Sequence, residues 1–181
     1  RSAVGLEKLA EGIRKRRANN DPELIVIETS GSCHPMPLIQ FLKKNEAVQL
    51  NGVFALVDCL MLSQDYNDGS NLIPSMQENL SNGSRDTVNL LVEQILFSSH
   101  VFLTKTDRIS DDQFSSIASV ISTINPHSHQ HAVYFGKVEI DSLLQLPQYD
   151  YFQVEQLMAE LAPVLAAETL KNRPYDLETR V

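Results

Sequence analysis

The stretch HVFLTKTD, residues 100–107, joins a short apolar run to a charged turn. Leu24–Ile27 and Gly52–Val57 are apolar runs of the same kind, and each is followed by an acid. Short unbroken runs of β-branched and aromatic residues are typical of parallel strands that are buried on both faces. We therefore expect strands at these three places and a fourth at Gln130–Tyr134.

Helical patterns lie between the predicted strands. Apolar residues recur there at helical spacing, and the predicted helices cover residues 4–18, 35–44, 85–98, 110–124 and 150–170. Strands that alternate with helices predict an α/β fold, with an open, mainly parallel twisted sheet flanked by helices. Residues 63–84 are rich in Asn, Asp, Ser and Gly, so we expect weak order in that segment.

The composition argues against several classes of protein. The chain has 181 residues, with 15 Lys and Arg against 23 Asp and Glu, so its formal net charge is −8. This charge disfavours binding to nucleic acid or to an anionic membrane, and no apolar stretch approaches the ~18 residues of a membrane span. Two cysteines cannot build a disulfide framework, so we expect a reducing, cytoplasmic location.

Polar residues follow the predicted strands, where open parallel sheets bind their ligands. This rule places Glu28–Gly31, Asp58, Thr104–Asp107 and Asn125–His131 close together. A carboxylate such as Glu28 can orient a magnesium ion, and the Gly31 amide can donate to a phosphate oxygen at close approach. The alternative is an ordinary turn, in which the acid caps a helix and the glycine allows a positive φ.

The turn Thr104–Asp107 offers a carboxylate that can accept from both the ring N–H and the exocyclic amine of guanine. Adenine presents no such pair of donors, so this carboxylate would discriminate between the two bases. The aliphatic part of Lys105 can lie across the base while its charge stays in solvent. The alternative is a solvated turn, where Lys and Asp are common.

Two segments contain side chains that commonly ligate transition metals. His127, His129 and His131 would project from one face of a strand, and Cys33-His34 follows the Gly31 turn. Together they could hold zinc or cobalt. The alternative is an exposed polar loop with solvated histidines. We expect His100 to be a core or strand-entry residue and Cys59 a buried apolar one.

The ordered set of motifs resembles the CobW family of P-loop GTPases, which includes HypB and UreG as relatives, over roughly residues 20 to 145. The set comprises ETSG at 28–31, a proline-containing helix start, GVFALVD at 52–58, Gln94-Ile95, VFLTKTD at 101–107 and Ile124-Asn125-Pro126. The resemblance implies a P-loop NTPase-like fold and the binding of GTP and magnesium. It also implies that Glu28 serves the magnesium site and that Gly31 senses the γ-phosphate.

The resemblance further implies that Lys105 and Asp107 read guanine and that Asn125 borders the base. Thr104 stands where the family usually has Asn, which implies a weaker guanine preference. The phosphate loop G-x-x-x-x-G-K-[ST] and the family's Cys-x-Cys-Cys motif do not occur in these residues. We expect both upstream of Arg1, so that this chain alone would hydrolyse GTP poorly.

The resemblance predicts an incomplete GTPase domain over residues 1–172, followed at 173–181 by a linker and the first strand of another domain. It implies a metallochaperone that couples GTP binding and hydrolysis to delivery of zinc or cobalt to a client metalloprotein, as a monomer or a homo-oligomer. The alternative is a non-catalytic α/β binding or scaffold domain with a His/Cys metal-binding patch. An upstream phosphate loop would distinguish the two.

Overall fold

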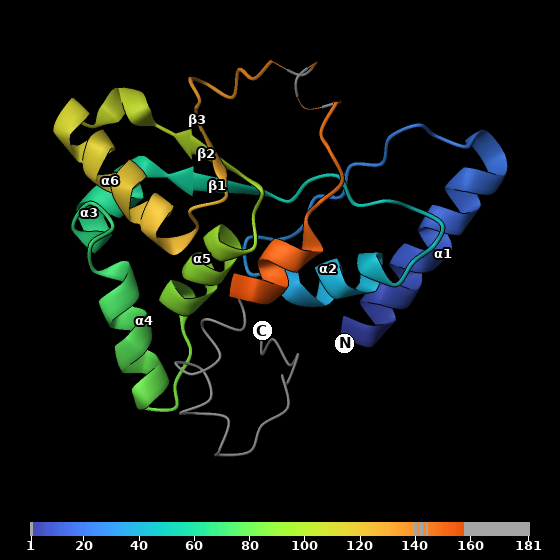
Figure 1. Cartoon of the computed structure of the whole chain (residues 1–181), viewed down its shortest axis with the longest axis horizontal. Coiled ribbons are helices and arrows are strands. Elements are labelled where there is room, and N and C mark those ends of the chain that lie inside the picture. The colour runs from blue at the N-terminus through green and yellow to red at the C-terminus, as the bar shows by residue number, and fades with distance from the viewer. Residues whose placement is uncertain (1, 140, 142, 144, 158–181) are drawn as a thin grey trace.

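Three parallel strands form the sheet, in the order β1-β2-β3 (Figure 1). The computed structural model describes residues 2–139, 141, 143 and 145–157. The strands are β1 (Phe54–Asp58), β2 (His100–Thr104) and β3 (His129–Ala132). Phe54 pairs with His100, and His100 pairs in turn with His129, so the first residues of the strands are aligned. The predicted α/β class with a parallel sheet is confirmed.

Helices precede and connect the strands, and the apolar periodicity predicted most but not all of them. They are α1 (Ser2–Asn20), α2 (Pro35–Lys43), α3 (Cys59–Tyr66), α4 (Leu72–Ser81), α5 (Thr87–Leu96), the short 3-10 helix η1 (Thr106–Arg108) and α6 (Asp111–Ile124). The helices predicted at 4–18, 35–44, 85–98 and 110–124 are therefore confirmed. Residues 151–157 are also helical, and the rest of the helix predicted at 150–170 lies outside the described residues.

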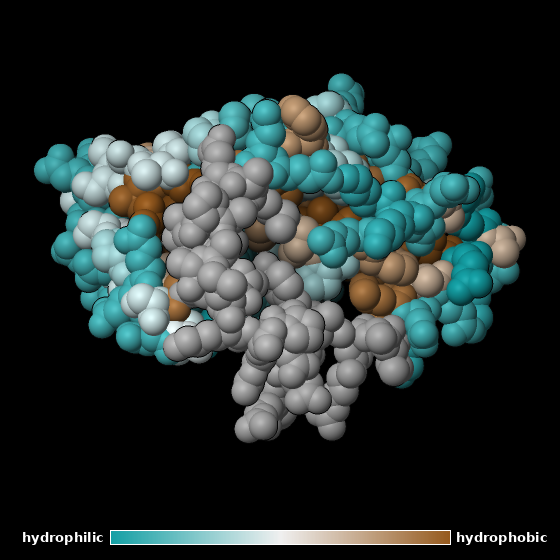
Figure 2. Space-filling model, turned by 60° about the horizontal axis from the view of Figure 1, so that its bottom comes forward, coloured by the Kyte–Doolittle hydropathy of each residue, from teal (hydrophilic) through white to brown (hydrophobic). Residues whose placement is uncertain are grey.

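The core lies on one face of the sheet. Alternate residues of β1 and β2, such as Val57 and Val101, are almost fully buried there against α3, α5 and α6. Leu62, Ile95 and Ile117 from these helices are completely buried. Seen from below, the surface is largely hydrophilic, with apolar residues confined to small areas between polar ones (Figure 2). Within the described residues, no helix is both long enough and apolar enough to cross a bilayer.

The strand predicted at Leu24–Ile27 is absent from the structure, and this prediction was wrong. The segment has no secondary structure, and Val26 is 83% exposed. β1 pairs only with β2, and no described segment pairs with residues 24–27. A β-branched run prefers an extended backbone, but it becomes a strand only when a neighbouring strand supplies hydrogen bonds.

The expectation of weak order in residues 63–84 was also wrong. The segment contains the end of α3 and all of α4, and Leu72, Met76 and Leu80 of α4 are buried. These residues follow one another at four-residue spacing, so they form a single apolar stripe that packs on the core. The polar residues of the segment lie on the exposed side of α4 and in the turn before it, where Gly69 has a φ of +86°.

Candidate functional site

The carboxyl edge of the sheet is built from the ends of β1 and β2, where Asp58 and Thr104 are register partners. The Thr104 hydroxyl donates to the Val57 carbonyl over 3.1 Å, which ties the start of the turn to the neighbouring strand. Thr104 stands where the family that the sequence resembles usually has Asn. Its hydroxyl still holds the turn, through a hydrogen bond to the neighbouring strand.

Lys105 adopts a left-handed backbone conformation, with φ +57° and ψ +28°. Its ammonium group contacts the Asp58 carboxylate at 2.5 Å, so the lysine is held over the end of β1. Asp58 also accepts from the Met61 amide at 3.1 Å and thereby caps α3. Burial on its own would raise the pKa of Asp58, but the bonds from Lys105 and Met61 outweigh it and lower that pKa.

Asp107 lies on η1, two residues after Lys105, and its side chain is exposed. No hydrogen bond or ion pair joins its carboxylate to another described residue, whereas Asp58 is fully engaged. The neighbouring Thr106 hydroxyl oxygen is buried without a partner in the described part of the chain. The turn therefore presents an unengaged carboxylate to solvent, just after two residues, Thr104 and Lys105, that are bound to β1.

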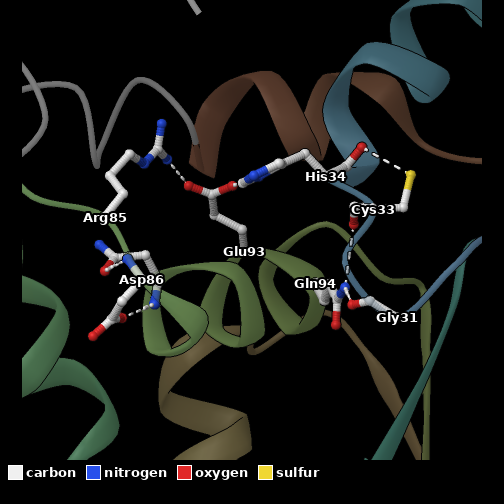
Figure 3. Close-up of polar contacts among 8 residues, drawn as sticks. Gly31, Cys33, His34, Arg85, Asp86, Glu93 and Gln94 are labelled. Carbon is white, nitrogen blue, oxygen red and sulfur yellow. Dashed lines mark hydrogen bonds and ion pairs between the residues drawn. The ribbon is translucent and has the colours of Figure 1, made fainter. Parts of the chain in front are cut away.

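The Gly31 turn lies against α5 (Figure 3). Gln94 donates from its amide nitrogen to the carbonyls of Gly31, at 2.9 Å, and Cys33, at 3.2 Å. One residue earlier on α5, Glu93 binds the His34 ring at 3.0 Å and forms an ion pair with Arg85. Burial, and then the positive charge of Arg85, lowers the pKa of His34. Because a carboxylate can only accept, the His34 Nδ1 carries the hydrogen of this bond and donates it to Glu93.

Gly31 lies in an exposed turn, but two features of the ordinary-turn alternative, a helix cap at Glu28 and a positive φ at Gly31, are not found. Gly31 does not have a positive φ, and a Cβ placed on it would meet no atom within 4 Å. Internal packing and backbone strain therefore do not require glycine here. Glu28 is exposed, precedes no helix and has no hydrogen-bond partner among the described residues. Its free carboxylate is the hard oxygen donor that magnesium prefers, so the side chain fits that role.

Asn125 lies at the opposite edge of the sheet from Thr104, which conflicts with the prediction that it borders the base. β3 begins only at His129, so Asn125 stands before the amino end of that strand. The side chain is buried and donates to the carbonyls of Ile95, Leu96 and Ser98 at 2.8–3.1 Å. The carbonyls of Ile95 and Leu96 end α5, and that of Ser98 follows it, so Asn125 caps the C-terminus of that helix.

The predicted metal ligands do not come together. The structure groups His129 and His131 with His100, and the His100 Nδ1 lies 2.9 Å from the His131 Nε2. His127 precedes β3 and is exposed, and Cys33 and His34 lie against α5. Among the described residues, no group of three or more His, Cys, Asp and Glu side chains is arranged to hold a metal ion. The register between β2 and β3 brings these histidines together, since His100 and His129 are the first residues of adjacent strands.

His100 and Cys59 are core residues, as expected from the sequence. Cys59 is completely buried at the start of α3, and burial followed by the nearby charge of Asp58 raises its pKa to about 11. Burial, followed by the proximity of His129 and His131, lowers the pKa of His100 to about 4. Both groups are neutral at pH 7, and the protonated, buried Cys59 thiol is a poor nucleophile and a poor metal ligand.

Sequence reasoning missed two residues that hold the site. Asp58 was placed at this edge without a role, and the structure shows that it anchors Lys105. The sequence marks Gln94 only as part of a motif, and the structure shows that it binds the Gly31 turn.

The structure conflicts with the prediction that the Gly31 turn lies beside the Thr104–Asp107 turn. Gln94 binds the Gly31 turn near the C-terminal end of α5, which adjoins the amino end of β2, whereas Thr104 is at the carboxyl end of that strand. No hydrogen bond or ion pair joins the two turns within the described residues.

A parallel α/β sheet with polar turns at its carboxyl edge is the architecture of a P-loop NTPase-like nucleotide-binding domain. The chain belongs to the CobW/HypB/UreG family, because the model of that family's nucleotide-binding domain matches residues 4–132, more than half of the chain. The family resemblance deduced from the motifs is therefore confirmed.

Two curated relatives have the name zinc-regulated GTPase metalloprotein activator 1. The chain is 25% identical to the one from Dictyostelium discoideum over 140 residues, which cover 71% of this chain and 29% of that protein. It is 27% identical to the one from Schizosaccharomyces pombe over 147 residues, covering 78% and 31%. The chain thus spans about a third of the length of these relatives. No solved structure gives a significant match.

Proposed function

We propose that this chain is the nucleotide-binding part of a GTPase that couples its nucleotide state to delivery of zinc or cobalt to a client metalloprotein. The observation that carries the proposal is the unengaged Asp107 carboxylate on a braced, exposed turn. Ligands of open parallel sheets bind outside the carboxyl ends of the strands, which supports a nucleotide site at this turn. The printed names of the two relatives, which describe zinc-regulated GTPases that activate metalloproteins, support the metal and client parts of the proposal.

Recognition of guanine would rest on Asp107 and Lys105. The Asp107 carboxylate would accept two N–H groups from one edge of guanine, and adenine would leave it unpaired. Lys105, fixed by Asp58 at 2.5 Å, would place its aliphatic part beside the ring. Thr104 would keep the turn in place through its bond to Val57.

Magnesium and the terminal phosphate would be served by Glu28 and the Gly31 turn. A bound magnesium ion would neutralise charge on the phosphates and help to position them. The exposed Glu28 carboxylate would orient the ion or its waters, and backbone amides of the Gly31 turn would donate to a phosphate oxygen. Open space around Gly31 allows this close approach. The boundary between a GTPase domain at 1–172 and a following segment at 173–181 stays a prediction.

The experiment is a competition titration on the full-length gene product, with a fluorescent GTP analogue displaced by GTP or ATP in the presence of magnesium. We expect a preference for GTP that Asp107→Ala reduces by about 10- to 100-fold, the value of a lost pair of charged hydrogen bonds. Asp65→Ala is the matched control, because Asp65 is an exposed acid on α3. Equal affinity of the wild type for GTP and ATP would instead favour the non-catalytic binding domain.

A further inference from the structure

A two-residue turn follows β3 and carries an aromatic side chain at its tip. Tyr134 and Lys137 form an antiparallel bridge, and the Lys137 amide donates to the Tyr134 carbonyl over 3.0 Å. The two residues between them, Phe135 and Gly136, have φ angles of +50° and +72°. Two consecutive positive φ angles are typical of a type I′ hairpin turn, which favours Asn, Asp or Gly at both positions. Phe135 thus has a backbone conformation that bulky residues rarely adopt.

The Phe135 ring makes no visible contribution to folding. The residue is 89% exposed, and neither it nor Tyr134 belongs to the hydrophobic core of the described residues. A Cβ placed on the neighbouring Gly136 would meet no atom within 4 Å, so the space around the turn is open. Strained backbone conformations cluster at sites that bind ligands, and exposed apolar side chains in such places are available for contact. The ring therefore points to a ligand rather than to the core.

The turn lies at the carboxyl edge of the sheet, next to the turn that ends β2. β2 and β3 are parallel, and their last register pair is Leu103 with Ala132. The Val133 amide extends this pairing, because it donates to the Leu103 carbonyl over 2.8 Å. Lys105 and Tyr134 thus each stand two residues beyond the last pair, after strands that run about 5 Å apart. The aromatic turn and the lysine are neighbours at one edge.

This placement gives the proposed base site a second wall. Asn125, which the sequence predicted beside the base, lies at the other edge of the sheet and cannot supply one. In the proposed site Asp107 accepts from one edge of guanine, and the aliphatic part of Lys105 covers one face of the ring. The opposite face would be left in water. An aromatic ring stacks favourably on the face of a nucleobase, and Phe135 offers such a ring at the same edge.

We propose that Phe135 stacks on the base of the bound nucleotide, so that the turn 134–137 forms the wall of the base site opposite Lys105. The inference rests on the proposed GTPase function. Every base has a π face, so stacking adds affinity for any nucleotide and leaves the choice of guanine to Asp107.

The test is a titration of the full-length gene product with GTP, GDP and ATP in the presence of magnesium. Phe135→Asn removes the ring and keeps a residue that suits a positive φ, so the turn itself should form at least as well. We expect its affinity for all three nucleotides to fall by the same factor, about tenfold, with the preference for GTP over ATP unchanged. Phe135→Trp keeps an aromatic ring and should bind at least as tightly as the wild type.

Phe152→Asn is the matched control, because Phe152 is another exposed phenylalanine, at 67%, and lies outside the turn. It should bind nucleotides like the wild type. Urea unfolding separates binding from folding, since the midpoint of Phe135→Asn should equal or exceed that of the wild type. A lower midpoint would mean that the ring supports the fold, and that result would overturn the inference.

The outcomes separate this inference from the proposed function. Wild-type affinities in Phe135→Asn would overturn the stacking role, while a preference for GTP that depends on Asp107 would leave the proposed function standing. A variant that loses only its preference for GTP would also overturn stacking, because the ring would then select guanine. A wild-type protein that binds none of the three nucleotides would refute both.

Discussion

Asn125 offers the sharpest test of the structure, because its sequence context and its position predict different effects of mutation. The motif places it beside the base, whereas the structure buries it at 3% exposure beneath the end of α5. We predict that Asn125→Ala destabilises the chain and leaves its choice between GTP and ATP unchanged.

The expected size follows from the carbonyls that lose a donor. The Ile95 carbonyl keeps the Ser98 hydroxyl at 2.8 Å, so it remains satisfied. The carbonyls of Leu96 and Ser98 have Asn125 as their side-chain donor, and the His127 amide loses the Asn125 oxygen at 3.0 Å. A buried polar group left unpaired costs about 1–3 kcal/mol. Two unpaired carbonyls, partly reached by water in the space that is left, cost about 2–4 kcal/mol in the free energy of unfolding.

The assay is urea unfolding of the wild type and the variant, followed by far-ultraviolet circular dichroism. Thr123→Ala is the control, because Thr123 lies on the exposed side of α6 and its hydroxyl bonds only within the helix, to Ser119. We expect that change to stay within about 0.5 kcal/mol.

Guanine preference is then measured by GTP and ATP competition on the full-length gene product. The reasoning would be refuted by an Asn125→Ala variant that unfolds within about 0.5 kcal/mol of the wild type but loses its discrimination between GTP and ATP. That result would mean that the side chain serves the nucleotide rather than the end of α5.

Two further predictions concern the core and the histidine face of the sheet. Leu72→Ala should lower the free energy of unfolding by about 2–5 kcal/mol, because Leu72 is completely buried, and urea unfolding would show no such loss if residues 63–84 were weakly ordered. The folded-state pKa of His100, about 4, lies below its ordinary value of 6.5, so stability from its neutral form is complete above pH 6.5 and is lost as the pH falls toward 4. With solvent screening at this face taken into account, the free energy of unfolding falls by about 1–2 kcal/mol. The urea midpoint is measured from pH 7.5 to 4.5. It should fall less steeply in His100→Phe than in the wild type or in the control variant His127→Leu, whose histidine is exposed. Equal slopes would contradict the assignment.

Most of the elements and their order were predictable from the sequence, because they depend on local patterns. A strand is indicated by the apolar run before Thr104, and a helix by the spacing of Ile117, Ile121 and Ile124. Parallel order followed from the alternation of strands and helices. The polar turn at Thr104–Asp107 was predictable for the same reason, since it continues a strand without a break.

Partners in space were not predictable, because they depend on pairing and on the lengths of connections. Leu24–Ile27 has the composition of a strand, but only a neighbour that bonds to it could make it one. The histidines at 129 and 131 meet His100 because register aligns the first residues of β2 and β3. Asn125 lies at the amino edge because the chain between α6 and β3 is short, so β3 starts just four residues later, at His129.

Local periodicity therefore determined by itself most of the helices and strands of this protein and the polar turn Thr104–Asp107 that follows β2. Only the tertiary structure decided which residues support this turn and the Gly31 turn. Asp58 binds Lys105, Gln94 binds the Gly31 carbonyl, and Glu93 binds His34. The physical reason is that these bonds join residues far apart in sequence, and their formation depends on how helices pack against the sheet, which no local pattern encodes.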